Sequence, residues 1–190
     1  MANKWVTMGV WGDSIVHGGC DEVMGGWVNR LRVYCWGRGL GDHVFNLGLG
    51  GNNSTHVLAR IGAELRARAG HLEHVLVSVG VNDLLHPDAP VLPPEFESNL
   101  RGIVAEARAQ GKTPHLLSLI PINKEPAKCA IYNAVIEHVA KDTGAGFVDL
   151  RTCLEAADMP DLVHPHAGGH EKMFQAVKAH FMSTGLIPAE

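Results

Sequence analysis

Short apolar runs alternate along this chain with segments whose apolar residues recur every three or four positions. Runs of the first kind are typical of buried strands, and the second spacing is typical of amphipathic helices. The predicted strands are residues 6–11, 43–47, 74–79, 114–120 and 146–150. The predicted helices have apolar faces within residues 24–35, 57–65, 96–107, 131–139 and 173–181. Four prolines between Leu84 and Pro94 predict a loop in that segment.

This alternation predicts an α/β fold with a parallel sheet and helices on both faces. No internal repeat, low-complexity tract or linker interrupts the pattern, so we expect one domain over residues 1–190. For five strands the natural expectation is the flavodoxin-like strand order 2-1-3-4-5. In such open sheets, ligands bind at the carboxyl ends of the strands.

Composition narrows the class of protein without identifying it. The 190 residues are 46% hydrophobic, which is typical of a globular protein. The formal net charge of −4 indicates no basic surface of the kind that binds nucleic acid. We see neither the apolar region of a secretory signal nor a stretch long enough to span a membrane. The scattered cysteines are expected to be reduced thiols, which favours a cytoplasmic location; they are Cys20, Cys35, Cys129 and Cys153. The pattern carries no signal of an oligomeric state.

Polar residues collect where the predicted strands end. Asp13 and Ser14 follow the first strand, residues 46–52 follow the second, and residues 80–83 follow the third. Residues 161–165 lie in the segment after the fifth strand. Because the carboxyl ends of parallel strands share one edge of the sheet, we expect these four blocks to converge.

The converging residues are chemically complementary. A serine hydroxyl is a weak nucleophile that needs a base, and His164 can serve Ser14 in that role. Asp161, three residues before the histidine, can hold the imidazole in the required tautomer. The backbone N–H groups of Ser14 and Gly51 and the side-chain amide of Asn82 can donate to an oxyanion. Each element alone is common, and only the joint pattern points to catalysis.

Taken together, the four blocks resemble those of the SGNH hydrolases of the GDSL esterase/lipase type. The blocks are Gly12–Ile15, Asn46–Gly51, Gly80–Asp83 and Asp161–Pro165, and the resemblance spans residues 6 to about 175. Ile15 replaces the leucine of the family name, which is a conservative change. The resemblance implies a three-layer α/β/α flavodoxin-like fold and a serine ester hydrolase that needs no metal and no organic cofactor.

The resemblance also implies a role for each site residue. Ser14 is the expected nucleophile, His164 the base and Asp161 the residue that orients it, while Ser14, Gly51 and Asn82 form the expected oxyanion hole. Gly51 is preferred over Gly50 because the family usually places its donor glycine five residues after the asparagine of the second block. The expected substrate is a small soluble ester or thioester.

Several alternatives remain open from the sequence. The same residues suit an acyltransferase, and the turn at residues 48–53 suits a non-catalytic flavodoxin-like module that holds a phosphorylated ligand. His164, His166 and His170 resemble a metal motif, but Pro165 and two glycines break any regular ligand face. Cys20, close to the nucleophile, is interpreted as a packing residue or as part of the pocket wall.

Overall fold

The computed structural model describes residues 5–41, 43–86 and 89–189. Its centre is a five-stranded sheet whose strands all run parallel, in the order β2-β1-β3-β4-β5. The strands are β1 (Met8–Gly12), β2 (Val44–Gly48), β3 (His74–Ser78), β4 (Thr113–Leu117) and β5 (Gly146–Val148). The predicted order 2-1-3-4-5 is therefore confirmed.

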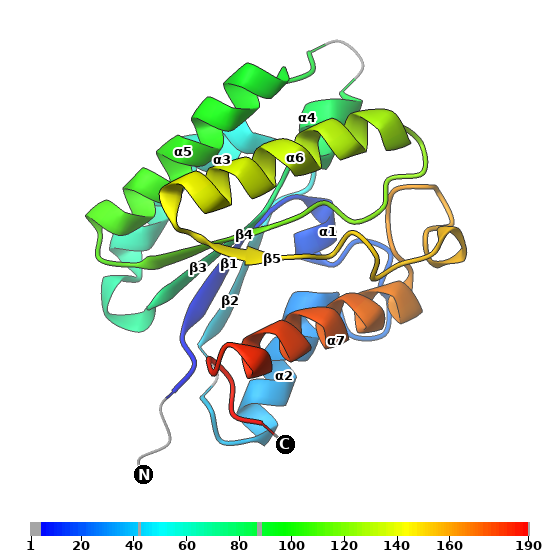
Figure 1. The fold of residues 1–190 in the computed structure, drawn as a ribbon. Helices are drawn as coiled ribbons and strands as arrows, with labels where there is room; N and C mark the ends of the chain where they lie inside the picture. The colour runs from blue at the N-terminus through cyan, green and yellow to red at the C-terminus, as the bar shows by residue number, and fades with distance from the viewer. Residues whose placement is uncertain (1–4, 42, 87–88, 190) are drawn as a thin grey trace.

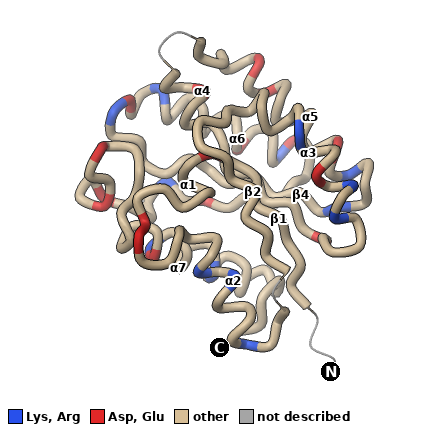
Figure 2. Tube along the Cα trace, turned by 180° about the vertical axis from the view of Figure 1, so that it is seen from behind, with Lys and Arg blue, Asp and Glu red and all other residues tan. Residues whose placement is uncertain are grey.

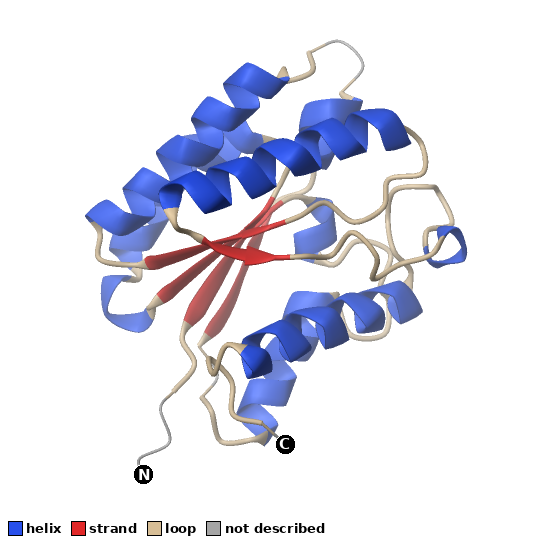
Figure 3. Ribbon diagram, in the orientation of Figure 1, coloured by secondary structure: helices blue, strands red, loops and turns tan. Residues whose placement is uncertain are grey.

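Helices cover both faces of this sheet (Figures 1 and 3). On one face lie α3 (Ser54–Ala67), α4 (Val81–Leu85), α5 (Pro93–Ala109) and α6 (Pro126–Thr143). On the other face lie α1 (Ser14–His17), α2 (Trp27–Gly37) and α7 (Ala167–Ser183). Two short 3₁₀ turns, η1 (Ala69–His71) and η2 (Ala156–Asp158), complete the described elements.

Burial explains why these segments form these elements. Strand β1 is buried along its whole length because helices pack on both faces of the central strands. Each long helix turns one apolar stripe to the sheet, as Val57, Ile61 and Leu65 do from α3. Trp11 and Phe181 are among the largest fully buried side chains, one from each end of the chain.

Some predicted boundaries were wrong. The expected loop at Leu84–Pro94 is shorter, because α4 continues to Leu85 and α5 begins at Pro93, where the first helical turn tolerates proline. Residues 87–88 of that loop lie outside the described part of the chain. The predicted fourth and fifth strands end early, at Leu117 and Val148. Met24 precedes α2 instead of lying on its apolar face.

Charged residues of both signs are distributed along the fold. In the view of Figure 2, acidic and basic residues are interspersed along the chain. No helix of the described residues is long and apolar enough to cross a membrane. The four cysteines are unpaired: Cys35 and Cys129 are buried, Cys153 is half-buried and Cys20 is exposed.

Candidate active site

The turn that carries Ser14 is fixed by its neighbours. Asp13 caps α1, and its Oδ1 accepts a hydrogen bond of 2.9 Å from the backbone N–H of Ile15. Gly12 is required just before this turn, since a Cβ there would lie 2.2 Å from the carbonyl oxygen of Ser78. The strand therefore ends with Ser14 as the first residue of a helix at the carboxyl edge of the sheet.

The structure brings Ser14, His164 and Asp161 into one hydrogen-bonded row. Ser14 Oγ lies 2.8 Å from Nε2 of His164, and Nδ1 of the same ring lies 2.6 Å from Oδ2 of Asp161. The side chains of His164 and Asp161 are 28% and 52% exposed, so this end of the row is open to solvent. A span of 150 residues in sequence is thus reduced to hydrogen-bond distance.

Asp161 is bound by backbone as well as by the imidazole. Its Oδ1 accepts the N–H groups of Val163 at 3.0 Å and His164 at 2.6 Å. Partial burial alone would raise the pKa of the Asp161 carboxyl, but these hydrogen bonds and the His164 ring outweigh burial and lower the pKa to about 2. The residue is therefore a carboxylate at neutral pH, facing the ring nitrogen Nδ1.

Two further carboxyl groups are buried beneath the site. Complete burial raises the pKa of Asp13 to about 6, although the backbone N–H groups of Ile15 and Val16 oppose that shift. Asp83 accepts the backbone N–H of Ser54 at 3.0 Å and also the Ser54 hydroxyl, and burial raises its pKa despite those bonds. Asp83 thereby links α4 by hydrogen bonds to Ser54, the first residue of α3.

The second and third polar blocks meet beside Ser14. The side-chain amide of Asn82 donates to the carbonyl of Asn52 at 2.9 Å, so the two predicted oxyanion blocks are in direct contact. Gly51 has a φ of +78°, a left-handed conformation that favours glycine. Within the described residues, the backbone N–H groups of Ser14 and Gly51 donate to no protein acceptor.

A set of contacts that the sequence did not reveal fixes the loop after α1. The Asp21 carboxylate accepts the N–H groups of Val23, Met24 and Gly26 and forms a buried ion pair with Arg30. This turn explains why α2 begins after Met24 rather than before it. Arg30 also donates to the carbonyl of the first residue of α7 at 3.2 Å. Sequence spacing carries no signal for such long-range partners.

The other two histidines of the segment 164–170 have structural roles. His166 caps α7 by accepting the N–H of Gly169 at 3.0 Å. His170 is fully buried, with Nδ1 accepting the N–H of Trp27 at 3.3 Å and Nε2 bonded to the carbonyl of Gly19 at 3.0 Å. The three histidines therefore do not converge on one point.

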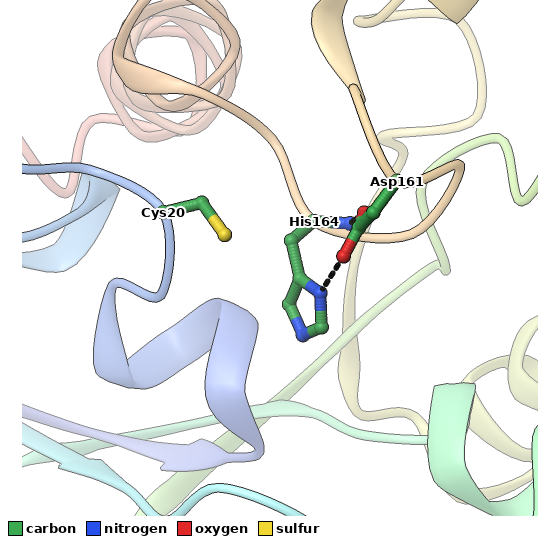
Figure 4. Close-up of side chains that lie close together, drawn as sticks. All are labelled: Cys20, Asp161 and His164. Carbon is green, nitrogen blue, oxygen red and sulfur yellow. Dashed lines mark hydrogen bonds and ion pairs between the residues drawn. The ribbon is translucent and has the colours of Figure 1, made fainter.

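Cys20 lies beside the row instead of packing into the core. The residue is exposed, which contradicts the packing interpretation, and its backbone has a φ of 66°. Its thiol faces the His164 and Asp161 side chains (Figure 4). One ligand atom from each of the three residues lies within 4.8 Å of the other two.

A Ser–His–Asp row at the carboxyl edge of a flavodoxin-like sheet places the molecule among the serine hydrolases of α/β/α architecture. The chain belongs to the GDSL-like lipase/acylhydrolase family, whose family model matches residues 10–172. It is accordingly a carboxylic ester hydrolase, as the resemblance of the four sequence blocks had implied. Comparison with curated protein sequences finds no match.

Solved structures share the whole fold. An acetylxylan esterase from Geobacillus stearothermophilus, Axe2, is 25% identical, with 100% of this chain and 98% of that chain covered and a TM-score of 0.80. LAE5, described as an alpha/beta hydrolase enzyme from the metagenome of Lake Arreo, is 24% identical, with 98% of both chains covered and a TM-score of 0.80. The likeness therefore extends over the sheet and the helices on both of its faces.

Proposed function

We propose that this protein hydrolyses small soluble esters through an acyl-enzyme formed on Ser14. The observation that carries the proposal is the unbroken row from Ser14 Oγ through His164 to Asp161, with spacings of 2.8 and 2.6 Å. Both distances are those of functional nucleophile–base and base–carboxylate pairs. In Axe2, catalytic mutants replace a serine, an aspartate and a histidine three positions after the aspartate, which is the spacing of Asp161 and His164.

The proposed reaction begins when Ser14 Oγ attacks the acyl carbonyl. His164 Nε2 takes the hydroxyl proton, and the carboxylate of Asp161 stabilises the imidazolium that results. The histidine then returns that proton to the leaving alcohol or thiol as the carbon–oxygen or carbon–sulfur bond breaks. Water, activated by the same histidine, releases the acid from Ser14. The steps balance in atoms and protons without any cofactor.

The negative oxygen of the tetrahedral intermediate needs donors that are aimed at it. We assign this role to the backbone N–H groups of Ser14 and Gly51 and to the side-chain amide of Asn82. Two observations support the assignment: neither N–H donates to a protein acceptor in the described chain, and Asn82 has a second amide hydrogen beyond the one bonded to Asn52. Gly50 remains the alternative backbone donor.

We propose acetyl and other short acyl esters with a hydrophilic leaving group as the substrates. The exposed edge of the row, at His164 and Asp161, leaves room for a soluble leaving group such as the sugar of an acetylated saccharide. The 25% identical structure is that of an acetylxylan esterase, which agrees with this class. Water reaches the same open edge, which favours hydrolysis over transfer to another alcohol.

An ester panel tests the proposal. Initial rates are measured on p-nitrophenyl esters of increasing acyl length, on acetylated xylo-oligosaccharides and on an acetyl thioester, beside the Ser14→Ala variant. The proposal predicts the highest kcat/KM for acetyl esters and loss of turnover in the variant. Ser118→Ala is the control, since Ser118 is a buried serine bonded to the N–H of Leu150. Full activity in Ser14→Ala would refute the mechanism, and a preference for long acyl chains would refute the substrate class.

A further inference from the structure

The thiol of Cys20 has no part in the reaction proposed above, yet it faces the residues that perform it. The loop after α1 presents this exposed side chain toward the imidazole of His164 (Figure 4). Among the described residues, Cys20, Asp161 and His164 are the one group of three such ligands whose ligand atoms all lie within 4.8 Å of one another.

The three donors form a set that suits one kind of ion. Thiolate sulfur, imidazole nitrogen and carboxylate oxygen are the ligands of Zn²⁺, whereas Mg²⁺ and Ca²⁺ prefer oxygen alone. With bond lengths of about 2.0–2.3 Å, the ligands of a tetrahedral zinc ion stand roughly 3.5 Å apart. The exposed side chain of Cys20 can close the remaining gap by rotation, because it is not packed into the core.

We propose that Cys20, Asp161 and His164 form a Zn²⁺ site that inhibits the enzyme reversibly. The inference rests on the proposed function, since it assigns regulation to the same histidine. On binding, the thiol gives its proton to solvent as the sulfur–zinc bond forms, and no atom is oxidised or reduced. A water molecule completes the tetrahedron.

Inhibition follows because the ion takes Nδ1, the imidazole nitrogen that Asp161 faces. Bound there, zinc replaces the proton shared with Asp161 across 2.6 Å. The neutral ring then carries its proton on Nε2, which lies 2.8 Å from Ser14 Oγ and can no longer accept the serine proton. The histidine thereby stops being a base. The open edge of the row gives a hydrated ion a path to the site.

Activity measurements provide the first arm of the test. Ester hydrolysis is titrated with Zn²⁺ in a non-chelating buffer, and EDTA is added afterwards to restore the rate. Each variant is compared with its own zinc-free rate. Cys20→Ala, which removes one ligand, requires at least about a tenfold higher zinc concentration for half-inhibition. Cys20→Gly is tested in parallel because glycine accepts the positive φ at this position. Cys153→Ala is the matched control, a half-buried cysteine whose pKa is raised by burial to about 12.

Metal binding provides the second arm and needs no turnover. Ser14→Ala keeps all three proposed ligands, so it binds one equivalent of Zn²⁺ in competition with a chromophoric chelator. Co²⁺ bound to the same variant gives a thiolate charge-transfer absorption that is lost when Cys20 is also replaced. The inference is overturned if Cys20→Ala is inhibited at the wild-type zinc concentration, or if removing Cys20 leaves the zinc affinity of Ser14→Ala unchanged. Failure of the esterase proposal alone would leave this binding arm intact.

Discussion

Replacing Asp161 by asparagine separates two contributions that the carboxylate makes. The side chain keeps its shape, and its remaining oxygen can still accept the N–H groups of Val163 and His164. Two properties change: the negative charge is lost, and an NH₂ group can now face Nδ1 of the imidazole. An NH₂ group there donates to Nδ1, so the neutral ring must carry its proton on Nε2. That tautomer cannot accept the proton of Ser14 Oγ.

The magnitude distinguishes the two effects. Because the Asp161 side chain is 52% exposed, its charge is screened, and an exposed ion pair is worth under about 1 kcal/mol. At about 1.4 kcal/mol per factor of ten, loss of that charge alone slows the reaction roughly fivefold. Loss of the correct tautomer is far more costly, with a fall in kcat of about 10⁴ for this substitution in another Ser–His–Asp enzyme. We therefore expect kcat to fall by about 10³–10⁴ with little change in KM.

The assay is steady-state hydrolysis of p-nitrophenyl acetate at pH 8, with a urea unfolding curve to show that the variant is folded. Asp158→Asn is the control, because Asp158 lies on the same segment but pairs with Lys172 at 2.8 Å rather than with the imidazole. A loss of less than tenfold in Asp161→Asn would mean that the carboxylate acts only through its charge. The tautomer argument would then be wrong.

Two other predictions concern the neighbouring polar groups. Asn82→Ala removes the proposed amide donor and should lower kcat by about 10²–10³, measured on the same ester; a loss confined to KM would indicate that Asn82 only positions substrate. Asp13→Asn tests the buried carboxyl, whose pKa is raised from 3.8 to about 6. The folded state therefore binds this proton more tightly than the unfolded state. The stability that the protonated Asp13 carboxyl contributes is fully present below pH 3.8 and is lost as the pH rises through 6. Relative to wild type, the free energy of unfolding of Asp13→Asn, measured in urea, should therefore be about 3 kcal/mol higher at pH 8 than at pH 3.5. An equal difference at the two pH values would contradict the raised pKa.

The sequence was sufficient for those parts of the molecule that depend on local pattern. Alternating apolar strands and amphipathic helices determine a parallel sheet, and the parallel sheet brings Ser14, Asn82 and His164 to one edge. The spacing of Asp161 and His164 was informative because a side chain three residues away along a turn can return to the ring. These predictions rest on short-range rules that any chain of this type obeys.

The parts that escaped prediction depend on contacts and short elements that leave no periodic pattern in the sequence. Nothing near Asp21 in the sequence indicates that Arg30 will become its buried partner. Cys20 precedes Asp21 in the loop after α1, and its exposed position beside His164 could not be inferred from its neighbours in the sequence. The short helix α4 was missed because its five residues are too few to show a helical period.

The distance between Ser14 and His164 depends on the contacts that hold their two segments together. His170 makes contacts of this kind, and its contribution can be tested alone. Its Nδ1 accepts the N–H of Trp27 at the start of α2, so Nε2 carries the proton that is donated to the carbonyl of Gly19. The residue thereby connects α7, which begins just after His164, to the loop that follows Ser14. It touches no reacting atom and acts as a positioning residue.

His170→Ala leaves a backbone N–H and a carbonyl without their partner, and each buried group left unpaired costs about 1–3 kcal/mol. We expect the free energy of unfolding to fall by about 2–5 kcal/mol and kcat to fall while KM for the acetyl ester stays constant. His170→Gln should restore part of both, since its amide can donate to the Gly19 carbonyl. His180→Ala, on the far end of α7, is the control.

The pH dependence gives a second readout, because protonation of the ring would place a proton on Nδ1 and remove the acceptor of the Trp27 N–H. Burial is the main reason that the pKa of His170 lies below its usual value, because the folded protein requires the neutral ring. The stabilisation it provides is therefore complete above the unfolded pKa, about 6.5, and is lost as the pH falls through the lowered folded value. The stability difference between wild type and His170→Ala should accordingly shrink as the pH is lowered below 6.5. A difference that stays constant from pH 8 to pH 5 would show that the folded protein tolerates the charged ring, which contradicts a role for Nδ1 as the acceptor of the Trp27 N–H. The Asp21–Arg30 pair would then be the contact that holds the loop after Ser14 against α7.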